Sequence, residues 1–282
     1  MSIILINQIP DAIKDRIDKF FDLIPSNVLI VKEKFFFKKI NNSWGPSLNS
    51  FLNFEKTNNI KRINKFHNEV NALLKNGDYY LSCAETIEQR NDRNHSKIPN
   101  GFKNIYLATD FIYKRVAPKL PIIKSIYFFI TRGHNRVMSK AEILGRLISC
   151  GFSIEEYFEH NNLLYVISKK KKKPSYDMKA SYYPIFKMKR IGRNGKHINI
   201  YKFRTMYPYS EYLQDFIVKD NGYASNGKIK DDYRVTSWGR IFRKYWLDET
   251  PQLINWLKGD LKLVGVRPLS QSFLNEYPEL LF

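Results

Sequence analysis

The stretch that decides the fold of the C-terminal half is DDYRVTSWGRIFRKYWLDETPQLINWLKGDLKLVGVRPLS, residues 231–270. Apolar residues recur in its first part at the spacing of one helix face, which predicts an amphipathic helix over residues 238–247. We expect this face to pack in a core. The alternative is that part of it meets lipid while neighbouring arginines meet headgroups. The face consists of Trp238, Ile241, Phe242, Tyr245 and Trp246.

An acidic pair, Asp248 and Glu249, follows this predicted helix. Thr250 is a suitable N-cap residue and Pro251 fits the first helical position, so we expect a second helix to begin there. The pair would then lie at a joint beside the positive end of that helix, which favours ionised carboxylates. Such carboxylates can bind Mg²⁺ or attack a phosphoryl group, although acids at helix N-termini are also common capping residues.

The residues that follow this joint carry further structural signals. Leu253, Ile254 and Leu257 predict a buried stripe on the second helix, and residues 261–266 predict a strand that leads to Arg267. Asn255, Asp260 and Arg267 would approach the acidic joint only if that strand folds back along the helix.

A β-hairpin is predicted upstream, with strands over residues 185–189 and 197–203 joined by the turn at residues 192–195. Lys202 and Arg204 lie two residues apart, so a strand would place them on the same face. Such a pair suits phosphate oxygens, but it is also common on ordinary protein surfaces.

The motif RIGRNGKHINIYKFRTM, residues 190–206, followed by the opening stretch, resembles the bacterial sugar transferases, the small monotopic phosphoglycosyl transferase family. The resemblance covers about residues 183–278, with several separate motifs in the family's order. It implies an α+β catalytic domain that transfers a sugar 1-phosphate from a nucleotide diphosphate sugar to a polyprenyl phosphate, initiating exopolysaccharide or surface glycan synthesis.

The resemblance also implies roles for individual residues. Asp248 would be the nucleophile that forms a covalent aspartyl intermediate, and Glu249 would help bind Mg²⁺ or handle the acceptor's proton. Both carboxylates are expected to be ligands of this Mg²⁺. Further basic residues match positions that contact phosphates or shape the site, namely Lys202, Arg204, Arg234, Arg240 and Arg267.

The chain departs from the family pattern in places. Family members usually carry an apolar re-entrant membrane helix before the RIGRNG motif, where this chain has a lysine tract and PSYDMKASYYP. The family pattern also continues beyond the point where this chain stops, so a catalytic domain truncated at its C-terminus is expected. The alternative function is therefore a non-catalytic homologue that acts as a partner or scaffold in polysaccharide assembly.

The N-terminal half alternates between helix and strand patterns and predicts an α/β domain. The stretches EVNALLKNGDYY (residues 69–80) and LGRLISCGFSIEEYFEHNNLLYVISKK (residues 144–170) resemble a class I methyltransferase-like Rossmann domain. No glycine cluster follows the predicted strand at residues 27–31, so we expect a degenerate scaffold without a methyl-donor cofactor. Ser139 and Glu142 form a capping box that predicts a helix over residues 139–149.

The sequence thus predicts an α/β protein with a degenerate Rossmann-like domain over residues 1–168, a basic linker over residues 169–174 and a catalytic domain over residues 175–282. Lys169 to Lys173 form an unbroken lysine tract followed by Pro174, which predicts a solvated linker.

Composition narrows the possible partners. The 282 residues carry a formal charge of +20, and 43% are hydrophobic, which argues against a disordered basic tail. The two cysteines cannot form a disulfide framework. The charge indicates an anionic partner, but no nucleic-acid motif is present, so a nucleic acid is not expected. No apolar run reaches the roughly 18–20 residues needed to span a bilayer. We therefore expect a cytoplasmic protein, peripheral on the anionic inner face of the membrane.

Overall fold

The structure is a computed structural model, and its contacts divide the chain into two compact units. The N-terminal unit comprises Met1–Lys179 and Pro208–Asp231, and the C-terminal unit comprises Ala180–Tyr207 and Asp232–Phe282. The residues that the structure describes are 9–21, 28–31, 48–95, 99, 102–117, 120, 123–175, 183–192, 195–225 and 229–265.

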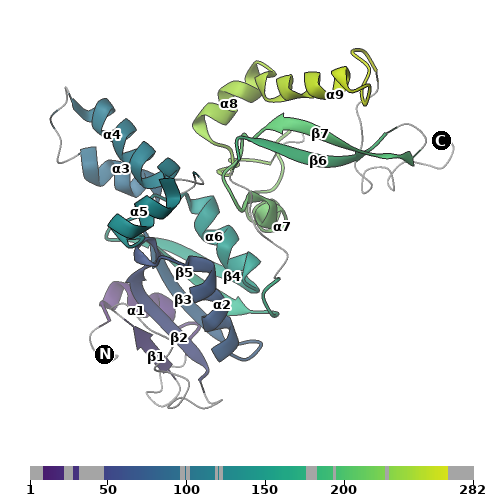
Figure 1. The fold of residues 1–282 in the computed structure, drawn as a ribbon. Helices are drawn as coiled ribbons and strands as arrows, with labels where there is room; N and C mark the ends of the chain where they lie inside the picture. The colour runs from purple at the N-terminus through teal and green to yellow at the C-terminus, as the bar shows by residue number, and fades with distance from the viewer. Residues whose placement is uncertain are drawn as a thin grey trace. The chain divides into compact units, whose positions relative to one another are not determined.

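A five-stranded mixed sheet forms the centre of the N-terminal unit (Figure 1), in the order β1-β2-β3-β5-β4. β1, β2 and β3 are parallel, whereas β5 runs antiparallel to both β3 and β4. This mixed sheet with helices confirms the predicted α/β class. The strands are β1 (Val28–Val31), β2 (Ser50–Lys56), β3 (Tyr79–Ala84), β4 (Phe152–His160) and β5 (Leu163–Lys170).

Helices cover both faces of this sheet. Helix α1 (Asp11–Ile17) buries Ile13 and Ile17 in one core cluster with Leu52 and Leu81 of the sheet. On the opposite face, Phe66 of α2 (Ile63–Leu73) makes an edge-to-face ring contact with Phe51 of β2. Helix α6 (Lys140–Ser149) contacts α2, β4 and β5. Side chains that alternate along the strands therefore bury both faces of the sheet.

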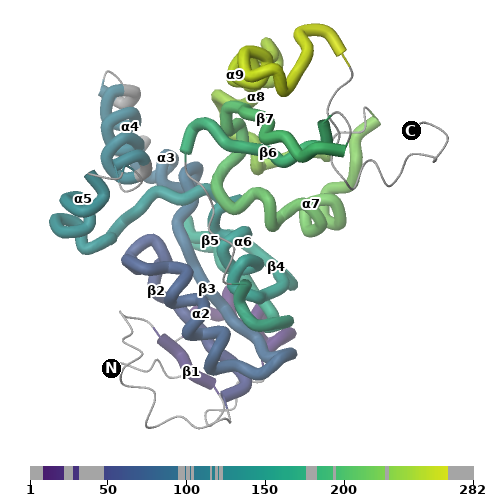
Figure 2. Tube along the Cα trace, turned by 45° about the vertical axis from the view of Figure 1, so that its right-hand side comes forward, coloured from purple at the N-terminus to yellow at the C-terminus, as the bar shows by residue number. Residues whose placement is uncertain are grey.

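The predicted capping box at the start of α6 is confirmed, because the Ser139 hydroxyl accepts a hydrogen bond from the Glu142 amide at 3.1 Å. Between β3 and α6 the chain forms α3, α4, a π-helical turn η5 and α5, which lie together near one end of the sheet (Figure 2). These elements are α3 (Ile87–His95), α4 (Lys103–Phe111), η5 (Ile112–Val116) and α5 (Ile123–Thr131). The later helices of the unit are η8 (Ser210–Leu213) and α7 (Gln214–Asn221), and a short 3-10 turn, η3 (Thr57–Asn59), follows β2.

The lysine tract starts inside the sheet and differs there from the predicted linker. Lys169 and Lys170 are the last residues of β5. The Lys170 ammonium donates hydrogen bonds to the carbonyls of Asn71 and Leu74 at 2.6 and 2.7 Å, at the C-terminal end of α2. A cation is favourable there because the last helical carbonyls have no partners within the helix. Charge repulsion along the tract is thus outweighed by strand pairing and this cap.

Residues 208–231 lie within the predicted catalytic domain but pack in the N-terminal unit. Tyr209 holds them there: its hydroxyl accepts hydrogen bonds from Asn64 at 2.7 Å and Arg146 at 3.2 Å. The Arg146 guanidinium also lies 4.5 Å from the centre of the Tyr209 ring. Gly145 of α6 allows this close approach, because a Cβ there would lie 2.7 Å from the Tyr209 Cβ and collide with its carbonyl oxygen.

The C-terminal unit contains the predicted β-hairpin followed by three consecutive helical segments (Figure 1). The hairpin strands pair from Ile185 opposite Phe203 to Ile191 opposite His197, which confirms the prediction. The strand predicted over residues 261–266 is wrong over residues 261–265, which form bends, and residue 266 lies outside the described residues. The elements are β6 (Ile185–Ile191), β7 (His197–Phe203), α8 (Ser237–Lys244), η9 (Leu247–Gln252) and α9 (Leu253–Leu257).

Gly145→Ala should destabilise the chain by about 1–3 kcal/mol, because the added methyl group overpacks the contact with Tyr209. Helix propensity alone would favour alanine, so the sign of the change tests the contact. Urea unfolding monitored by circular dichroism measures it.

Ser125→Ala in the exposed part of α5 is the matched control for helix propensity, and it should leave stability unchanged or slightly higher. A stabilising Gly145→Ala substitution would contradict the described packing of Tyr209 on α6.

Candidate active site in the C-terminal unit

The acidic pair lies in the first turn of a helical segment, but the helix begins earlier than predicted. Trp246 adopts a left-handed conformation with φ of 59°, and η9 starts directly after it at Leu247. The Thr250 hydroxyl does not cap a new helix, as predicted, and instead donates a hydrogen bond to the Leu247 carbonyl at 2.9 Å. The reversal at Trp246 therefore places Asp248 and Glu249 inside the first turn of η9.

The two carboxylates of this pair have different surroundings. Glu249 accepts a 2.5 Å hydrogen bond from the Lys202 ammonium and a 3.1 Å hydrogen bond from the Gln252 amide. Asp248 is half-buried and makes no side-chain hydrogen bond or ion pair within the described part of the chain. The pair thus combines one carboxylate that is held in place with one that is available to a ligand or substrate.

Asn255 holds this helical segment against β7. Its side chain is completely buried, accepts a hydrogen bond from the Tyr201 amide at 3.0 Å and donates one to the Asn199 carbonyl at 2.6 Å. It also donates to the Asp260 carboxylate at 3.2 Å. Because Lys202 follows Tyr201 in the strand, this clamp fixes the Lys202 backbone beside the turn that carries Glu249. The sequence predicted Asn255 near the joint only if a strand at 261–266 folded back, whereas the contact with β7 places it there without that strand.

A second polar cluster fixes the start of α8. The Thr236 hydroxyl caps the helix by accepting a hydrogen bond from the Gly239 amide at 3.0 Å, and it donates to the Thr205 carbonyl at 3.1 Å. Gly239 is required there, because a Cβ would collide with the Thr205 carbonyl and lie 2.6 Å from the Thr236 hydroxyl. Arg243 donates to the Thr205 hydroxyl at 2.9 Å.

The predicted phosphate-binding residues are only partly brought together. Lys202 lies at the acidic pair, whereas the Arg204 guanidinium donates to the Tyr183 carbonyl at 3.1 Å and lies 5.4 Å from the centre of the Phe186 ring. Arg240 is exposed and makes no side-chain contact of hydrogen-bond or ion-pair type with the described residues. Arg267 lies outside the described residues.

Arg234 is buried and forms a two-pronged ion pair with Asp232, with both N–O distances at 2.8 Å. Burial acts to raise the pKa of Asp232, but the hydrogen bonds and charge of Arg234 outweigh it, so the pKa is lowered. The Tyr207 amide also donates to the Arg234 carbonyl at 2.9 Å. In this structure the Arg234 guanidinium is therefore engaged with Asp232, and its backbone carbonyl links it to Tyr207.

Large apolar side chains of this unit are exposed where the sequence predicted packing. Trp246 is 71% exposed, and Leu257, expected in a buried stripe, is 76% exposed. Phe242 is the half-buried member of the α8 face, with edge-to-face ring contacts to Phe203 and Trp238. The core-packing prediction is therefore wrong for most of both faces. The other exposed large apolar residues between residues 237 and 265 are Trp238, Ile241, Tyr245, Leu247, Leu253, Ile254, Trp256, Leu263 and Val264.

The sequence of this unit matches known proteins. Residues 176–281 match the family model described as bacterial sugar transferase, which confirms the predicted resemblance of the C-terminal half. The undecaprenyl-phosphate galactose phosphotransferase of Salmonella typhimurium is 43% identical over 98 residues, which cover 33% of this chain and 21% of that protein.

Two further relatives match about a third of the chain. The galactosyl transferase CpsE of Streptococcus agalactiae is 44% identical over 85 residues, covering 30% of this chain and 19% of that protein. The uncharacterized sugar transferase EpsL of Bacillus subtilis is 43% identical over 94 residues, covering 33% and 41%. The chain therefore spans less than half of the length of each of these relatives.

Asn255→Ala should loosen η9 and α9 from β7, because it leaves the buried Tyr201 amide and Asn199 carbonyl without their partner, at about 1–3 kcal/mol for each unsatisfied group. Hydrogen exchange at the Tyr201 amide measures the loss directly and should become faster than in the wild type.

Gln252→Ala is the control, because it removes one hydrogen bond to Glu249 and leaves the Asn255 clamp intact. Unchanged exchange at Tyr201 in Asn255→Ala would show that the clamp does not hold this strand.

Proposed function

Because residues 176–281 match the bacterial sugar transferases, we propose that the chain is a phosphoglycosyl transferase, which moves a sugar 1-phosphate from a nucleotide diphosphate sugar to a polyprenyl phosphate. The observation that carries this proposal is the unengaged, half-buried carboxylate of Asp248 beside a Glu249 that Lys202 holds in place. The relatives include an undecaprenyl-phosphate galactose phosphotransferase, which supports a lipid-linked phosphate as the acceptor and the first step of exopolysaccharide synthesis as the pathway position.

In the first step of this reaction, an oxygen of the Asp248 carboxylate attacks the phosphorus that bears the sugar. A bond forms between this oxygen and phosphorus, and the anhydride bond to the second phosphorus breaks. The nucleoside monophosphate leaves with the electron pair. The form that can attack is an ionised carboxylate that the donor can reach.

In the second step, a phosphate oxygen of the polyprenyl phosphate attacks the same phosphorus. The bond from Asp248 to phosphorus breaks, the carboxylate is regenerated, and the sugar is left on a polyprenyl diphosphate. Splitting the transfer into two displacements lets one small site serve a soluble donor and a lipid acceptor in turn.

Lys202 has a specific part in this scheme. Its ammonium holds Glu249 now, and a donor diphosphate would compete with that carboxylate for the same cation. Arg240, exposed on α8, supplies a second cation for phosphate oxygens. Arg204 and Arg234 shape the site through their protein contacts, and Arg267 is proposed as a further phosphate ligand on sequence grounds.

Mg²⁺ is the proposed cofactor. The described residues contain no group of three or more His, Cys, Asp or Glu side chains that could hold a metal, so a site built by the protein alone does not fit. Mg²⁺ usually combines one or two carboxylates with substrate phosphates, and Asp248 with Glu249 fits that shared kind of site. When bound, the ion would neutralise charge on the diphosphate.

We place this activity at the cytoplasmic face of the membrane. Within the described residues, no helix has the length and hydropathy of a membrane span. The exposed apolar faces of α8, η9 and α9 are instead suited to lie in the interface, where Trp and Tyr side chains are favoured. Lys244 and Lys258 flank these faces and would meet anionic headgroups.

Asp248→Asn should abolish the covalent intermediate and nucleoside monophosphate release, because an amide cannot act as this nucleophile. The assay combines the full chain, Mg²⁺, polyprenyl phosphate and a panel of nucleotide diphosphate sugars, with intact-mass spectrometry to detect a phosphosugar adduct.

Asp231→Asn, at an exposed carboxylate of the N-terminal unit, is the control and should retain full activity. Full activity in Asp248→Asn would reassign the nucleophile. Failure of the wild type with every donor would favour the alternative, a non-catalytic partner in polysaccharide assembly.

Ile241→Asp together with Leu257→Asp should lower turnover with membrane-embedded polyprenyl phosphate by about tenfold or more, because each charge opposes burial in the interface. Hydrolysis of the donor in detergent solution should change little, since neither residue lies in the acidic pair. Equal losses in both assays would show that these faces do not act through the membrane.

A further inference from the structure

The N-terminal unit has an exposed apolar surface of its own, formed by residues 102–131, which we call the apolar hairpin. It comprises α4, η5 and α5. Among the described residues of this unit, every exposed large hydrophobic side chain except Tyr223 belongs to it. These side chains are Phe102, Ile105, Tyr106, Phe111, Ile112, Tyr113, Leu120, Ile123, Ile126, Phe129 and Ile130.

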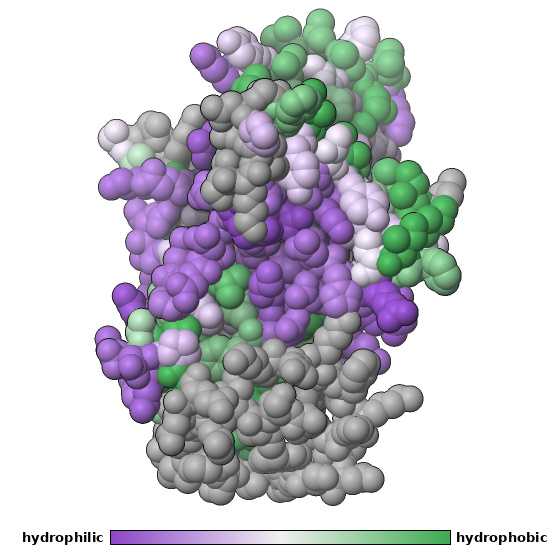
Figure 3. All heavy atoms as spheres, turned by 90° about the vertical axis from the view of Figure 1, so that its left-hand side faces the viewer, coloured by the Kyte–Doolittle hydropathy of each residue, from purple (hydrophilic) through white to green (hydrophobic). Residues whose placement is uncertain are grey.

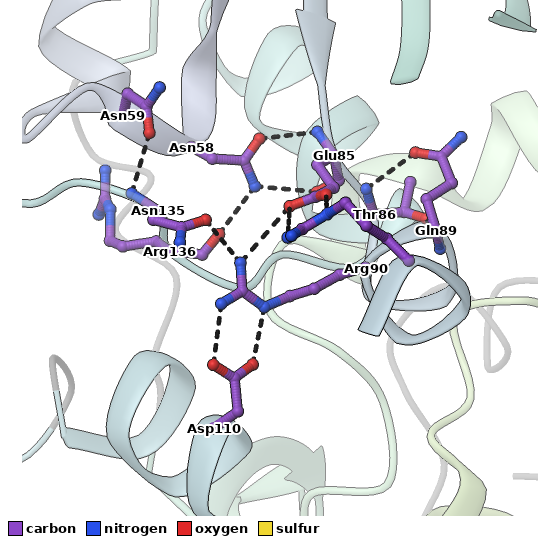
Figure 4. A network of polar contacts seen from close by, with 10 residues as sticks. Asn58, Asn59, Glu85, Thr86, Gln89, Arg90, Asp110, Asn135 and Arg136 are labelled. Carbon is purple, nitrogen blue, oxygen red and sulfur yellow. Dashed lines mark hydrogen bonds and ion pairs between the residues drawn. The ribbon is translucent and has the colours of Figure 1, made fainter. Parts of the chain in front are cut away.

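A buried polar network attaches the hairpin to the sheet (Figure 4). Arg90 of α3 donates two hydrogen bonds to the carboxylate of Asp110 in α4, at 2.7 and 2.8 Å. The same guanidinium donates hydrogen bonds to the Asn135 side chain at 2.6 Å and to the Glu85 carboxylate at 3.4 Å. Glu85 directly follows β3. Because Arg90 is buried, its bidentate ion pair with Asp110 holds α4 in a defined position against α3.

Aromatic contacts attach α5 on its inner side. Tyr127 is buried and makes an edge-to-face contact with Tyr113 of η5, with ring centres 5.5 Å apart. The Phe128 ring lies 5.8 Å from the Lys61 ammonium and 5.6 Å from the Arg136 guanidinium. The apolar residues that remain outside are therefore a fixed face and not the unpacked part of a loose helix.

The outward face of α5 follows helical spacing. Ile123, Ile126 and Ile130 recur at intervals of three and four residues, and Phe129 beside them is 85% exposed. Figure 3, which looks onto the side that carries α3 to α5 in Figure 1, shows hydrophilic residues over the middle of this side and a hydrophobic area beside them at the right. Exposed apolar patches of this kind mark interaction surfaces.

The net charge of the apolar hairpin indicates which kind of partner it would bind. Residues 102–132 contain one acidic residue, Asp110, which Arg90 already neutralises. The sequence has six basic residues there, and of those whose side chains the structure describes, Lys124 and Arg132 are exposed and Lys114 is half-buried. A surface that mixes isoleucine and aromatic side chains with lysine and arginine is complementary to an anionic bilayer. A second copy of the same surface would bring like charges together.

We infer that the apolar hairpin docks on an anionic lipid bilayer, with its apolar side chains at the boundary of headgroups and acyl chains. The nine residues of α5 extend about 13 Å, far less than the ~30 Å of a hydrocarbon core, so the hairpin lies in the interface and does not cross it. This goes beyond the proposed function, because no residue of the sugar transferase match at 176–281 takes part.

A site-specific fluorescent probe tests the inference on the full chain. Phe129→Cys is labelled with an environment-sensitive nitrobenzoxadiazole group, while Cys83 and Cys150 are buried and should not react. Vesicles of equal parts phosphatidylcholine and phosphatidylglycerol should shift the emission to the blue, and a lipid-bound quencher should reduce it. Glu155→Cys, an exposed position on β4, is the matched control and should show no change.

Several outcomes would overturn the inference. The probe at residue 129 could stay unchanged while the chain sediments with the vesicles. The probe could respond without vesicles as the protein concentration rises, which would indicate that a second copy of the chain covers this surface. It could also respond equally to vesicles of phosphatidylcholine alone, which would show that anionic lipid is not required. A separate probe at Leu257→Cys reports on the C-terminal unit, so failure of its proposed membrane contact is distinguishable from failure here.

A paired substitution gives an independent readout. Ile126→Asp with Phe129→Asp should weaken vesicle binding of the full chain by about tenfold or more, because two charges would enter the interface. Circular dichroism and urea unfolding should stay close to wild type, since both side chains are exposed. Unchanged vesicle binding by a folded double variant would refute the proposed docking.

Discussion

The geometry of the candidate site depends on one buried amide, Asn255. Its side chain is fully buried and forms hydrogen bonds with the backbone of Tyr201 and Asn199 on β7. A buried amide without partners would be costly, so the helical segment can dock only where these two backbone groups are available. That docking sets the register of η9 against the strand and places Lys202 beside Glu249. Asp248, one residue earlier, is then left without a protein partner among the described residues.

The acidic joint could be predicted because its signals are local: an amphipathic helix, a proline and two adjacent acids. The exact start of the helix could not, since Thr250 and Pro251 are good capping signals that were overridden by the left-handed turn at Trp246. Periodicity also shows that a helix has an apolar face without showing what covers it. For Ile241 and Leu257 the described protein covers little of that face, and the core prediction failed there for this reason.

In the N-terminal unit, the first strand and the Ser139 cap could be predicted from short-range patterns, whereas β2 was missed and long-range contacts could not be predicted. Tyr209 meets Asn64 across 145 residues of sequence, and nothing near either residue indicates that pairing. Lys170 shows the same limit for charge. A lysine tract predicts solvation, but one ammonium instead caps the carbonyl end of α2 while its backbone continues β5. Tertiary partners therefore decide what a charge run does.

The basic residues fall into two groups according to whether their side chains are paired with carboxylates of the protein. Arg234 and Arg90 are buried and paired with carboxylates, so they hold the fold and contribute little field to an approaching anion. Some exposed cations lie instead in helices that also expose apolar side chains, as Lys124 does in α5 and Arg240 does in α8. Water solvates these charges but gains nothing from the apolar side chains beside them. An anionic lipid interface satisfies both, and it is also where a lipid-linked phosphate acceptor would be found.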